Sequence, residues 1–282
     1  MAKMKKSVTG TSPIWQVCTY AVLLLVVLVA VFPAIWMLST SIKLPTEQYE
    51  SPPDHPGYYN QQLLNVLTNS KMYQAFVNSV IITVCVVAVT LFISILAGYG
   101  LSRYKFKGHG VLKIALLFGQ MIPSVVIIIP LYFLVAKTGL LDTHFSLIMA
   151  DMALTIPMGV IMLSSFFETV PKELEEAAKI DGCTGIGALF RVVLPIAKPG
   201  LISVAIYTYI HAWEEFLFAL NLSTSTRTRT LPIAIHMFAG EFSVDWGSTM
   251  AASAVVAFPV LLIFLSCNKY FVKGMADGAV KG

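Results

Sequence analysis

Six long apolar segments follow one another along the chain, and shorter polar segments separate them. A helix needs roughly 20 mostly apolar residues to cross the hydrocarbon core of a bilayer, and each segment is long enough to do so. The pattern therefore predicts an all-α integral membrane protein with six transmembrane helices. The predicted helices cover residues 16–38, 76–101, 111–134, 144–167, 200–222 and 249–270.

Composition supports the same class, because 57% of the residues are hydrophobic and only 12% are charged. Soluble domains have about 45–50% apolar and about 25% charged residues. The first apolar segment follows Lys3, Lys5 and Lys6, as the core of a signal peptide would. Its apolar stretch is longer than the roughly 7–15 residues of such a core, and no small-residue cleavage site follows it. We therefore expect this segment to remain in the protein as a helix.

Basic residues predict the orientation of the chain, since Lys and Arg concentrate in short cytoplasmic loops. With the N-terminus inside, only five of the 19 Lys and Arg residues lie on outer segments. These five are Lys43, Lys71, Lys137, Arg227 and Arg229. Both termini are therefore predicted to be cytoplasmic. The net charge of +4 is explained by this topology and gives no reason to expect nucleic acid as a partner.

The polar segments divide the chain into three predicted parts. Residues 1–75 would form an N-terminal transmembrane helix and an extracytoplasmic loop, with a short helix near residues 63–67. Residues 76–270 would form the core of five transmembrane helices, including a large cytoplasmic segment at about 168–199. Residues 271–282 would be a cytoplasmic tail.

Several prolines fall at membrane depth. Proline removes a backbone donor and kinks a helix, and neighbouring groups in a membrane bundle can satisfy the freed carbonyls. Kinked helices suit a bundle that surrounds a cavity, although the general frequency of proline in membrane helices explains most of these positions. They are Pro33, Pro123, Pro130, Pro157 and Pro259.

The sequence ELEEAAKIDG, at residues 173–182, is a charged stretch in the large cytoplasmic segment. Pro171 suits the first turn of a helix, and acidic residues are favourable near its positive N-terminal end. Leu174, Ala177 and Ala178 would form a narrow apolar stripe, and Gly182 would end the helix in a left-handed conformation.

A protein partner is the better interpretation of this helix. Helices that lie on a lipid surface carry Lys and Arg on the polar face and bulky apolar residues on the other, whereas this helix carries acidic residues and alanines. A second helix at about 184–193 should follow, ended by Pro195 and Pro199 before the fifth crossing.

The spacing of one motif resembles a known family. Glu176, Ala177 and Ala178 are followed by three residues, Gly182, nine residues and then VVLP, residues 192–195. This pattern resembles the Glu-Ala-Ala loop of ABC importer permeases, with valine in place of the usual isoleucine. Further stretches are similar to the carbohydrate-importer, maltose-type, binding-protein-dependent branch: NSV at 78–80, GYGLSRYKF at 98–106, LLDT at 140–143, AWEEFLFAL at 212–220 and GAVKG at 278–282.

The resemblance implies a type I ABC importer permease fold in the inner membrane, with several partners. They would be a homologous second permease subunit, two copies of an ABC ATPase, an extracytoplasmic solute-binding protein and a sugar. The chain has no G-x-x-x-x-G-K-[ST] sequence that could hold ATP phosphates. We therefore expect no catalytic activity and no cofactor in this chain, with ATP and Mg bound by the ATPase. The residues that the resemblance assigns to ATPase coupling are Glu173, Glu175, Glu176, Ala177, Ala178, Asp181 and Gly182.

Polar residues within the predicted helices are the candidates for the substrate path. Ionisable groups at membrane depth are costly and usually face a cavity or a partner. An aromatic ring beside carboxylates could bind a sugar, although pairing between helices or contact with the second permease would also explain these residues. Glu214 stands where the resembled family usually has Asn. The candidates are Gln120, Asp151, Trp213, Glu214 and Glu215.

Three alternatives remain at this point. A permease of the same type could carry a polyol or a glycerol phosphate instead of a sugar. An ion-driven secondary transporter would leave the acidic cytoplasmic helix unexplained. A membrane enzyme has the least support, because the five histidines form no H-x-x-x-H pair and G-x-S-x-G is absent.

Overall fold

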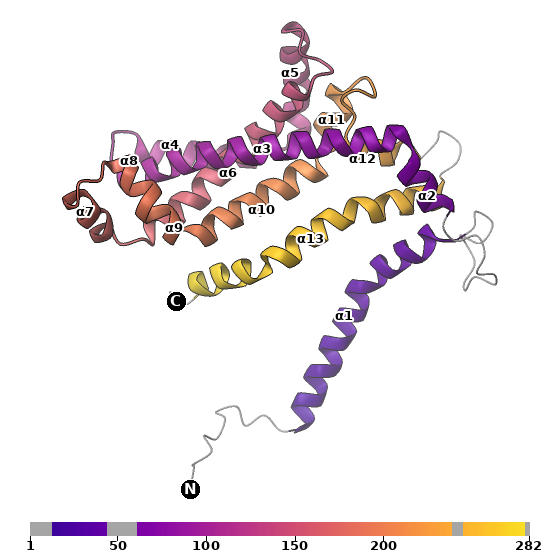
Figure 1. Cartoon of the computed structure of the whole chain (residues 1–282), viewed down its shortest axis with the longest axis horizontal. Coiled ribbons are helices and arrows are strands. Elements are labelled where there is room, and N and C mark those ends of the chain that lie inside the picture. The colour runs from indigo at the N-terminus through magenta and orange to yellow at the C-terminus, as the bar shows by residue number, and fades with distance from the viewer. Residues whose placement is uncertain (1–12, 44–60, 239–244, 280–282) are drawn as a thin grey trace.

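The computed structural model describes residues 13–43, 61–238 and 245–279, and the regular structure in these ranges is helical (Figure 1). The helices are α1 (Pro13–Ser41), α2 (Gln61–Thr68), α3 (Ser70–Arg103), α4 (His109–Met121), α5 (Ser124–Lys137), α6 (His144–Glu168), α7 (Lys172–Ile180), α8 (Gly185–Ala188), α9 (Leu194–Ile196), α10 (Lys198–Glu214), α11 (Leu217–Leu222), α12 (Leu231–His236) and α13 (Trp246–Ala279), with a π-helical turn at Leu189–Val193.

Four of the described helices, α1, α3, α6 and α13, are each long and apolar enough to cross a membrane. Two further spans would each consist of a bent pair of helices: α4 with α5, bent by 96°, and Gly185–Ile196 with α10, bent by 81°. The all-α class and up to six spans are therefore confirmed. The prediction that all six spans are single helices is wrong for the third and the fifth.

The third predicted span breaks at Pro123. This residue has extended backbone angles, φ −60° and ψ 132°, and stands between the end of α4 and the start of α5. Since proline has no N–H to continue the hydrogen-bond ladder, α5 starts in a new direction and projects from the layer of α3, α6 and α10 (Figure 1). Prolines 33, 130, 157 and 259 lie inside helices.

Helix bounds differ from the prediction at both ends of the core. The short helix α2 is confirmed, but α3 begins at Ser70 because the side chain of Asn69 caps it by accepting from the amides of Lys71 and Met72. Helix α13 continues to Ala279 instead of ending near 270. Part of the predicted outer loop, residues 44–60, and the last three residues of the predicted tail lie outside the described residues.

Helices α3 and α6 pack along most of their length, and two glycines allow the close approach (Figure 1). A Cβ atom on Gly98 would lie 3.0 Å from the backbone nitrogen of Ser164, and one on Gly159 would lie 2.5 Å from the hydroxyl oxygen of Ser94. Small residues at membrane helix interfaces let backbones approach in this way. The two helices therefore form a rigid pair at the centre of the bundle.

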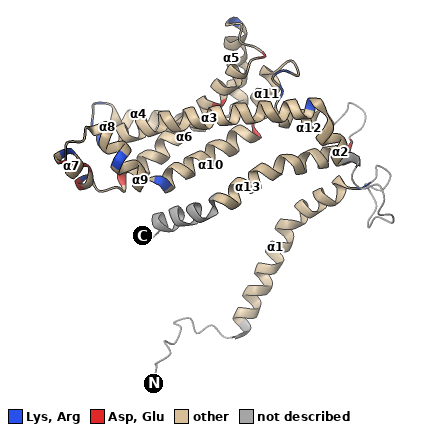
Figure 2. Ribbon diagram, in the orientation of Figure 1, with Lys and Arg blue, Asp and Glu red and all other residues tan. Residues whose placement is uncertain are grey.

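Charged residues gather at the ends of the bundle, above all around α7, and the middles of the helices carry few of them (Figure 2). Acidic residues where α10 gives way to α11 are the exception. Apolar side chains of α1, α4 and α5 are largely exposed, as expected for surfaces that face lipid.

Helix α7 is fastened to the end of α3 by the carboxylate of Glu175. Arg103 donates from Nε to Oε1 of Glu175 at 2.5 Å, and the hydroxyl of Tyr99 donates to Oε2 at 2.8 Å. Arg103 also donates to the carbonyl oxygen of Val170 at 3.0 Å. The side chains of Arg103 and Glu175 are only 7% and 5% exposed. Because both oxygens of the buried carboxylate have partners, α7 is held in one position against α3.

At the opposite end of the bundle, Asp142 in the turn between α5 and α6 binds the loop that follows α11. The hydroxyls of Ser225 and Thr228 each donate to its carboxylate at 2.5 Å, and the amides of Thr224 and Ser225 donate at 3.0 Å. Partial burial acts to raise the pKa of Asp142, but these hydrogen bonds outweigh it and hold the pKa well below its ordinary value. The two segments are thus joined by a charged hydrogen-bond cluster.

We expect Glu175→Ala to lower the free energy of unfolding by about 3 to 5 kcal/mol, because it leaves Arg103 buried without its counter-charge. Arg103→Ala should cost a similar amount. The double variant should cost clearly less than the sum of the two, since it leaves no unpaired charge. Thermal unfolding of the purified chain in detergent measures all three, and additive losses would contradict the pairing.

We expect Asp142→Asn to destabilise the protein at pH 7 by about 1 to 2 kcal/mol, because the amide loses charge-assisted hydrogen bonds. The folded pKa of Asp142 lies below the unfolded value of about 3.9, so its contribution is present above that pH and is lost as the pH falls through the folded pKa. Unfolding midpoints of the wild type and the variant should therefore converge as the medium is acidified. Equal midpoints at pH 7 would disprove the role of the cluster.

Candidate functional site

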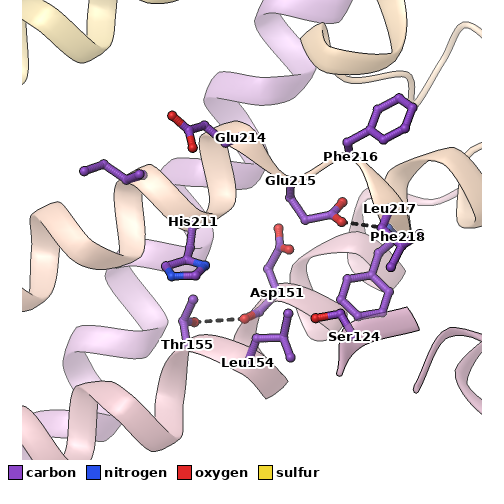
Figure 3. A pocket seen from close by; sticks show the side chains of 11 residues that line it. Ser124, Asp151, Leu154, Thr155, His211, Glu214, Glu215, Phe216, Leu217 and Phe218 are labelled. Carbon is purple, nitrogen blue, oxygen red and sulfur yellow. Dashed lines mark hydrogen bonds between the residues drawn. The ribbon is translucent and has the colours of Figure 1, made fainter. Parts of the chain in front are cut away.

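A cavity of about 400 Å³ lies where α5 and α6 meet the break between α10 and α11 (Figure 3). Its wall combines apolar side chains with a small number of polar ones, and none of the described residues that line it is Lys or Arg. The polar members are Ser124, Asp151, Thr155, His211, Glu214 and Glu215. A concave site of this size with few convergent polar groups is typical of a binding site for a small solute.

The break that shapes the cavity is stabilised by Glu215. Helix α10 ends at Glu214, and Glu215 has extended backbone angles, φ −62° and ψ 120°. The Glu215 carboxylate accepts from the amide of Phe218 at 2.7 Å and from that of Ala219 at 2.9 Å, so it replaces backbone acceptors that a continuous helix would supply. The predicted helix at 200–222 is therefore two helices.

Asp151 reaches the cavity from α6, on the opposite wall. It is only 5% exposed, and Figure 3 shows its carboxylate directed toward that of Glu215. Thr155, one turn further along α6, donates to the backbone carbonyl of Asp151 at 2.9 Å and shares a hydrogen bond with Thr90 of α3 at 3.0 Å. This part of α6 is thereby linked to α3.

Trp213, expected in the substrate path, does not line the cavity. The indole is 2% exposed and donates from Nε1 to the carbonyl oxygen of Val256 in α13 at 3.2 Å. It stacks on Tyr209 with ring centroids 5.5 Å apart, and the edge of Phe76 packs against it at 6.0 Å. The ring therefore anchors α10 to α13 inside the core.

The other candidates divide between the cavity and its surroundings. Glu214 is exposed and lines the cavity, but its carboxylate points away from those of Asp151 and Glu215 (Figure 3). Gln120 is not part of the lining; its amide donates to the carbonyl of Leu154 at 2.8 Å and joins α4 to α6.

The sequence also places the ionisable residue His211 at membrane depth, but it gave no role to His211 in the substrate path, and it did not point to Ser124 or Thr155. Thr155 and His211 could have been found from spacing, because they stand four residues after Asp151 and four residues before Glu215, on the same helix faces. Ser124 has no such signal, since the bend after Pro123 brings it to the wall.

The helix predicted at 173–182 is confirmed as α7. Pro171 stands at its N-cap, and Gly182 has φ +87°. The amides of Gly182 and Cys183 donate to the carbonyls of Lys179 and Ala178, which completes a Schellman motif.

The face that α7 presents outward differs from the predicted stripe. Ala178 and Glu175 are buried against this chain, whereas Leu174 and Ala177 are exposed. Glu175 was expected on the coupling surface, and its bonds to Tyr99 and Arg103 instead direct it inward. The expected coupling residues that remain exposed are Glu173, Glu176, Ala177, Asp181 and Gly182.

The helix predicted at about 184–193 is longer and less regular than expected. It starts as α8, continues through the π-helical turn and ends with α9 at Ile196, so Pro195 does not end it. Pro195 stands just after the π-helical turn, where the regular α-helical hydrogen-bond ladder is already interrupted, and this position tolerates proline. Apolar side chains at this end are exposed, namely Leu174, Ile180, Ile186 and Phe190.

Residues 90–277 match the profile of the family described as "Binding-protein-dependent transport system inner membrane component". The chain is 36% identical over 279 residues to the probable ABC transporter permease protein YurM of Bacillus subtilis, a match that covers 99% of this chain and 91% of that protein. It is 36% identical to the diacetylchitobiose uptake system permease protein DasC of Streptomyces coelicolor, over 99% of this chain and 100% of that one. The trehalose/maltose transport system permease protein MalG of Thermococcus litoralis is 35% identical, with coverage of 92% and 94%.

The fold is shared with solved structures at low sequence identity. A chain of a bacterial ABC transporter involved in the import of the acidic polysaccharide alginate has a TM-score of 0.80 and 21% identity, with 95% of this chain and 100% of that chain covered. A chain of the MetNI methionine ABC transporter has a TM-score of 0.53 and 17% identity, with coverage of 73% and 99%. The helical spans, the family profile and the relatives agree that this chain belongs to the inner-membrane components of binding-protein-dependent transport systems, as a multi-pass ABC transporter permease that is a transport subunit and not an enzyme.

Proposed function

We propose that this chain is the membrane-spanning subunit of an ATP-driven importer, and that it translocates a sugar or oligosaccharide delivered by an extracytoplasmic binding protein. The names of the trehalose/maltose and diacetylchitobiose permeases support a sugar as the cargo. A polyol or a glycerol phosphate is the alternative cargo for the same machinery.

The observation that carries this proposal is that one face of α7 is packed against this chain while the opposite face is exposed. One face is fixed to α3 through Glu175, while Glu176, Ala177 and Ile180 are exposed, with Ile180 at 87%. A small acidic and apolar face on a rigidly held helix suits docking to another protein. We propose that this face enters a groove on a separate ABC ATPase, so that α7 is the coupling helix. In this proposal both chain termini lie on the cytoplasmic side of the membrane, as α7 does.

ATP and Mg would be bound by two copies of that ATPase, since this chain has no phosphate-binding loop sequence. A homologous second permease would complete the path across the membrane. When the ATPase dimer closes, it would carry α7 with it, and the buried Glu175–Arg103 pair would pass the movement to α3. Because α3 and α6 pack closely at Gly98 and Gly159, α6 would move as well and change the access to the cavity.

We expect Glu176→Lys to abolish ATP-dependent uptake by the reconstituted importer and to weaken ATPase binding by about 2 kcal/mol, or about 30-fold. Glu176 is exposed, so this variant should fold normally. Gly182→Asp should act in the same direction, because a side chain at φ +87° is strained and would displace the end of α7. Uptake into proteoliposomes and co-purification of the ATPase measure the two effects.

Lys137→Glu is the control variant, because like Glu176→Lys it reverses one exposed charge. Lys137 lies at the end of α5, far along the chain from α7. This variant should leave ATPase binding unchanged. Normal uptake and normal ATPase binding in both α7 variants would refute the coupling role. Uptake by this chain without any ATPase would instead indicate an ion-driven transporter.

A further inference from the structure

The carboxylate of Asp151 is buried at the cavity without a partner. The side chain is 5% exposed, and among the described residues no hydrogen-bond donor, Lys or Arg is paired with its carboxylate oxygens. The hydrogen bond from Thr155 reaches only its backbone carbonyl. The carboxylate oxygens are not among the fully enclosed polar atoms, so they are accessible from the cavity. The geometry therefore leaves the cavity as the side from which a donor can come (Figure 3).

The surroundings of Asp151 hold further carboxyl groups and no Lys or Arg side chain among the described residues. Glu215 faces it across the cavity, with its own carboxylate bound by the two backbone amides of α11, and Glu214 lies on the rim. His211 is the basic side chain in the described wall; its ring packs against Tyr207 at 4.5 Å and makes no ion pair with Asp151. A wall with carboxyl groups and without Lys or Arg offers no basic partner to an anion and favours groups that donate hydrogen bonds.

The lining also argues against a bound metal ion. Within the described part of the chain, no group of three or more His, Cys, Asp or Glu residues is arranged to hold one. An organic solute in the cavity can supply O–H or N–H groups, which donate to a carboxylate in charge-assisted hydrogen bonds.

We infer that Asp151, together with Glu215, forms a binding site for the hydroxyl or ammonium groups of the transported solute. This site selects neutral or amine-bearing sugars and rejects sugars that carry carboxylate, sulfonate or phosphate groups. The inference rests on the proposed import function, and it adds the charge class of the cargo. It also assigns part of the selection to this subunit, in the membrane, and not to the binding protein alone.

The test measures the charge preference of the cavity directly and needs no knowledge of the sugar. Ser124, a half-buried residue of the wall, is replaced by cysteine in the full-length chain, in which the four native cysteines are changed to serine. The complete importer, in membranes with and without ATP, is treated with two thiosulfonate reagents of similar size. One reagent carries an ethylammonium group and the other an ethylsulfonate group. The rate of reaction with the cationic reagent is divided by the rate with the anionic reagent, and this ratio is compared with the ratio for a free thiol in solution.

We expect the cationic reagent to be favoured at Ser124→Cys, and Asp151→Asn to reduce this preference by a factor of about 3 to 10. Asp151→Glu, which keeps the charge, should retain it. A cysteine at Thr226, exposed on the outer loop beside Lys71 and Arg229, is the control position. Asp151→Asn should not change the ratio there.

Several results would overturn the inference. The first is a rate ratio at Ser124→Cys equal to that of a free thiol. The second is a rate ratio that Asp151→Asn does not change. The third is a cysteine that reacts with neither reagent, with or without ATP. ATP-dependent uptake of a sugar acid or sugar sulfonate through the unmodified chain would also overturn it, while leaving the import function intact. A cationic preference without any ATP-dependent uptake would instead refute the proposed function and leave the cavity assignment standing.

Discussion

The amides of Phe218 and Ala219 donate hydrogen bonds to the carboxylate of Glu215. The break between α10 and α11, and the cavity beside it, depend on these two hydrogen bonds. Lipid offers no partners for backbone groups, so a chain can leave helical geometry at this depth only where side chains or a cavity satisfy them. The Glu215 carboxylate is the hydrogen-bond acceptor for backbone amides at the start of α11, and the chain therefore turns between α10 and α11. The same turn brings Glu214 and Glu215 to the cavity that Asp151 enters from α6.

Buried acidic side chains act in opposite ways at the two ends of the helix pair α3 and α6. Glu175 has a partner for each carboxylate oxygen, which makes the junction between α7 and α3 stiff. Asp151 has none among the described residues, which leaves the cavity ready to accept a donor. The junction between α7 and α3 can pass on a movement of α7, and the carboxylate of Asp151 can accept a hydrogen bond from a solute. The close packing of α3 and α6 at Gly98 and Gly159 connects these two places.

Hydrophobic lengths were enough to predict the all-α class and the regions of the six spans, and Pro171, the acidic residues and Gly182 predicted the position of α7, because these features depend on local composition and spacing. The break near Pro123 had a local signal, but the break at Glu215 had none, since AWEEFLFAL continues the apolar pattern and the turn depends on side-chain bonds. Trp213 looked like a sugar platform beside two acids, yet packing against α13 directs it into the core. Likewise Arg103, distant in sequence, decides that Glu175 faces inward.

Helix α1 stands apart from the bundle, and its main neighbour in the described chain is α13, the last helix (Figure 1). The 27-residue span of α1 is uncovered by the rest of the chain, while Thr40 and Ser41 at its end are buried. Chains are synthesised from the N-terminus. Because α1 is made before α13, it is surrounded by lipid until the helices between them have been made, and its contact with α13 closes only then.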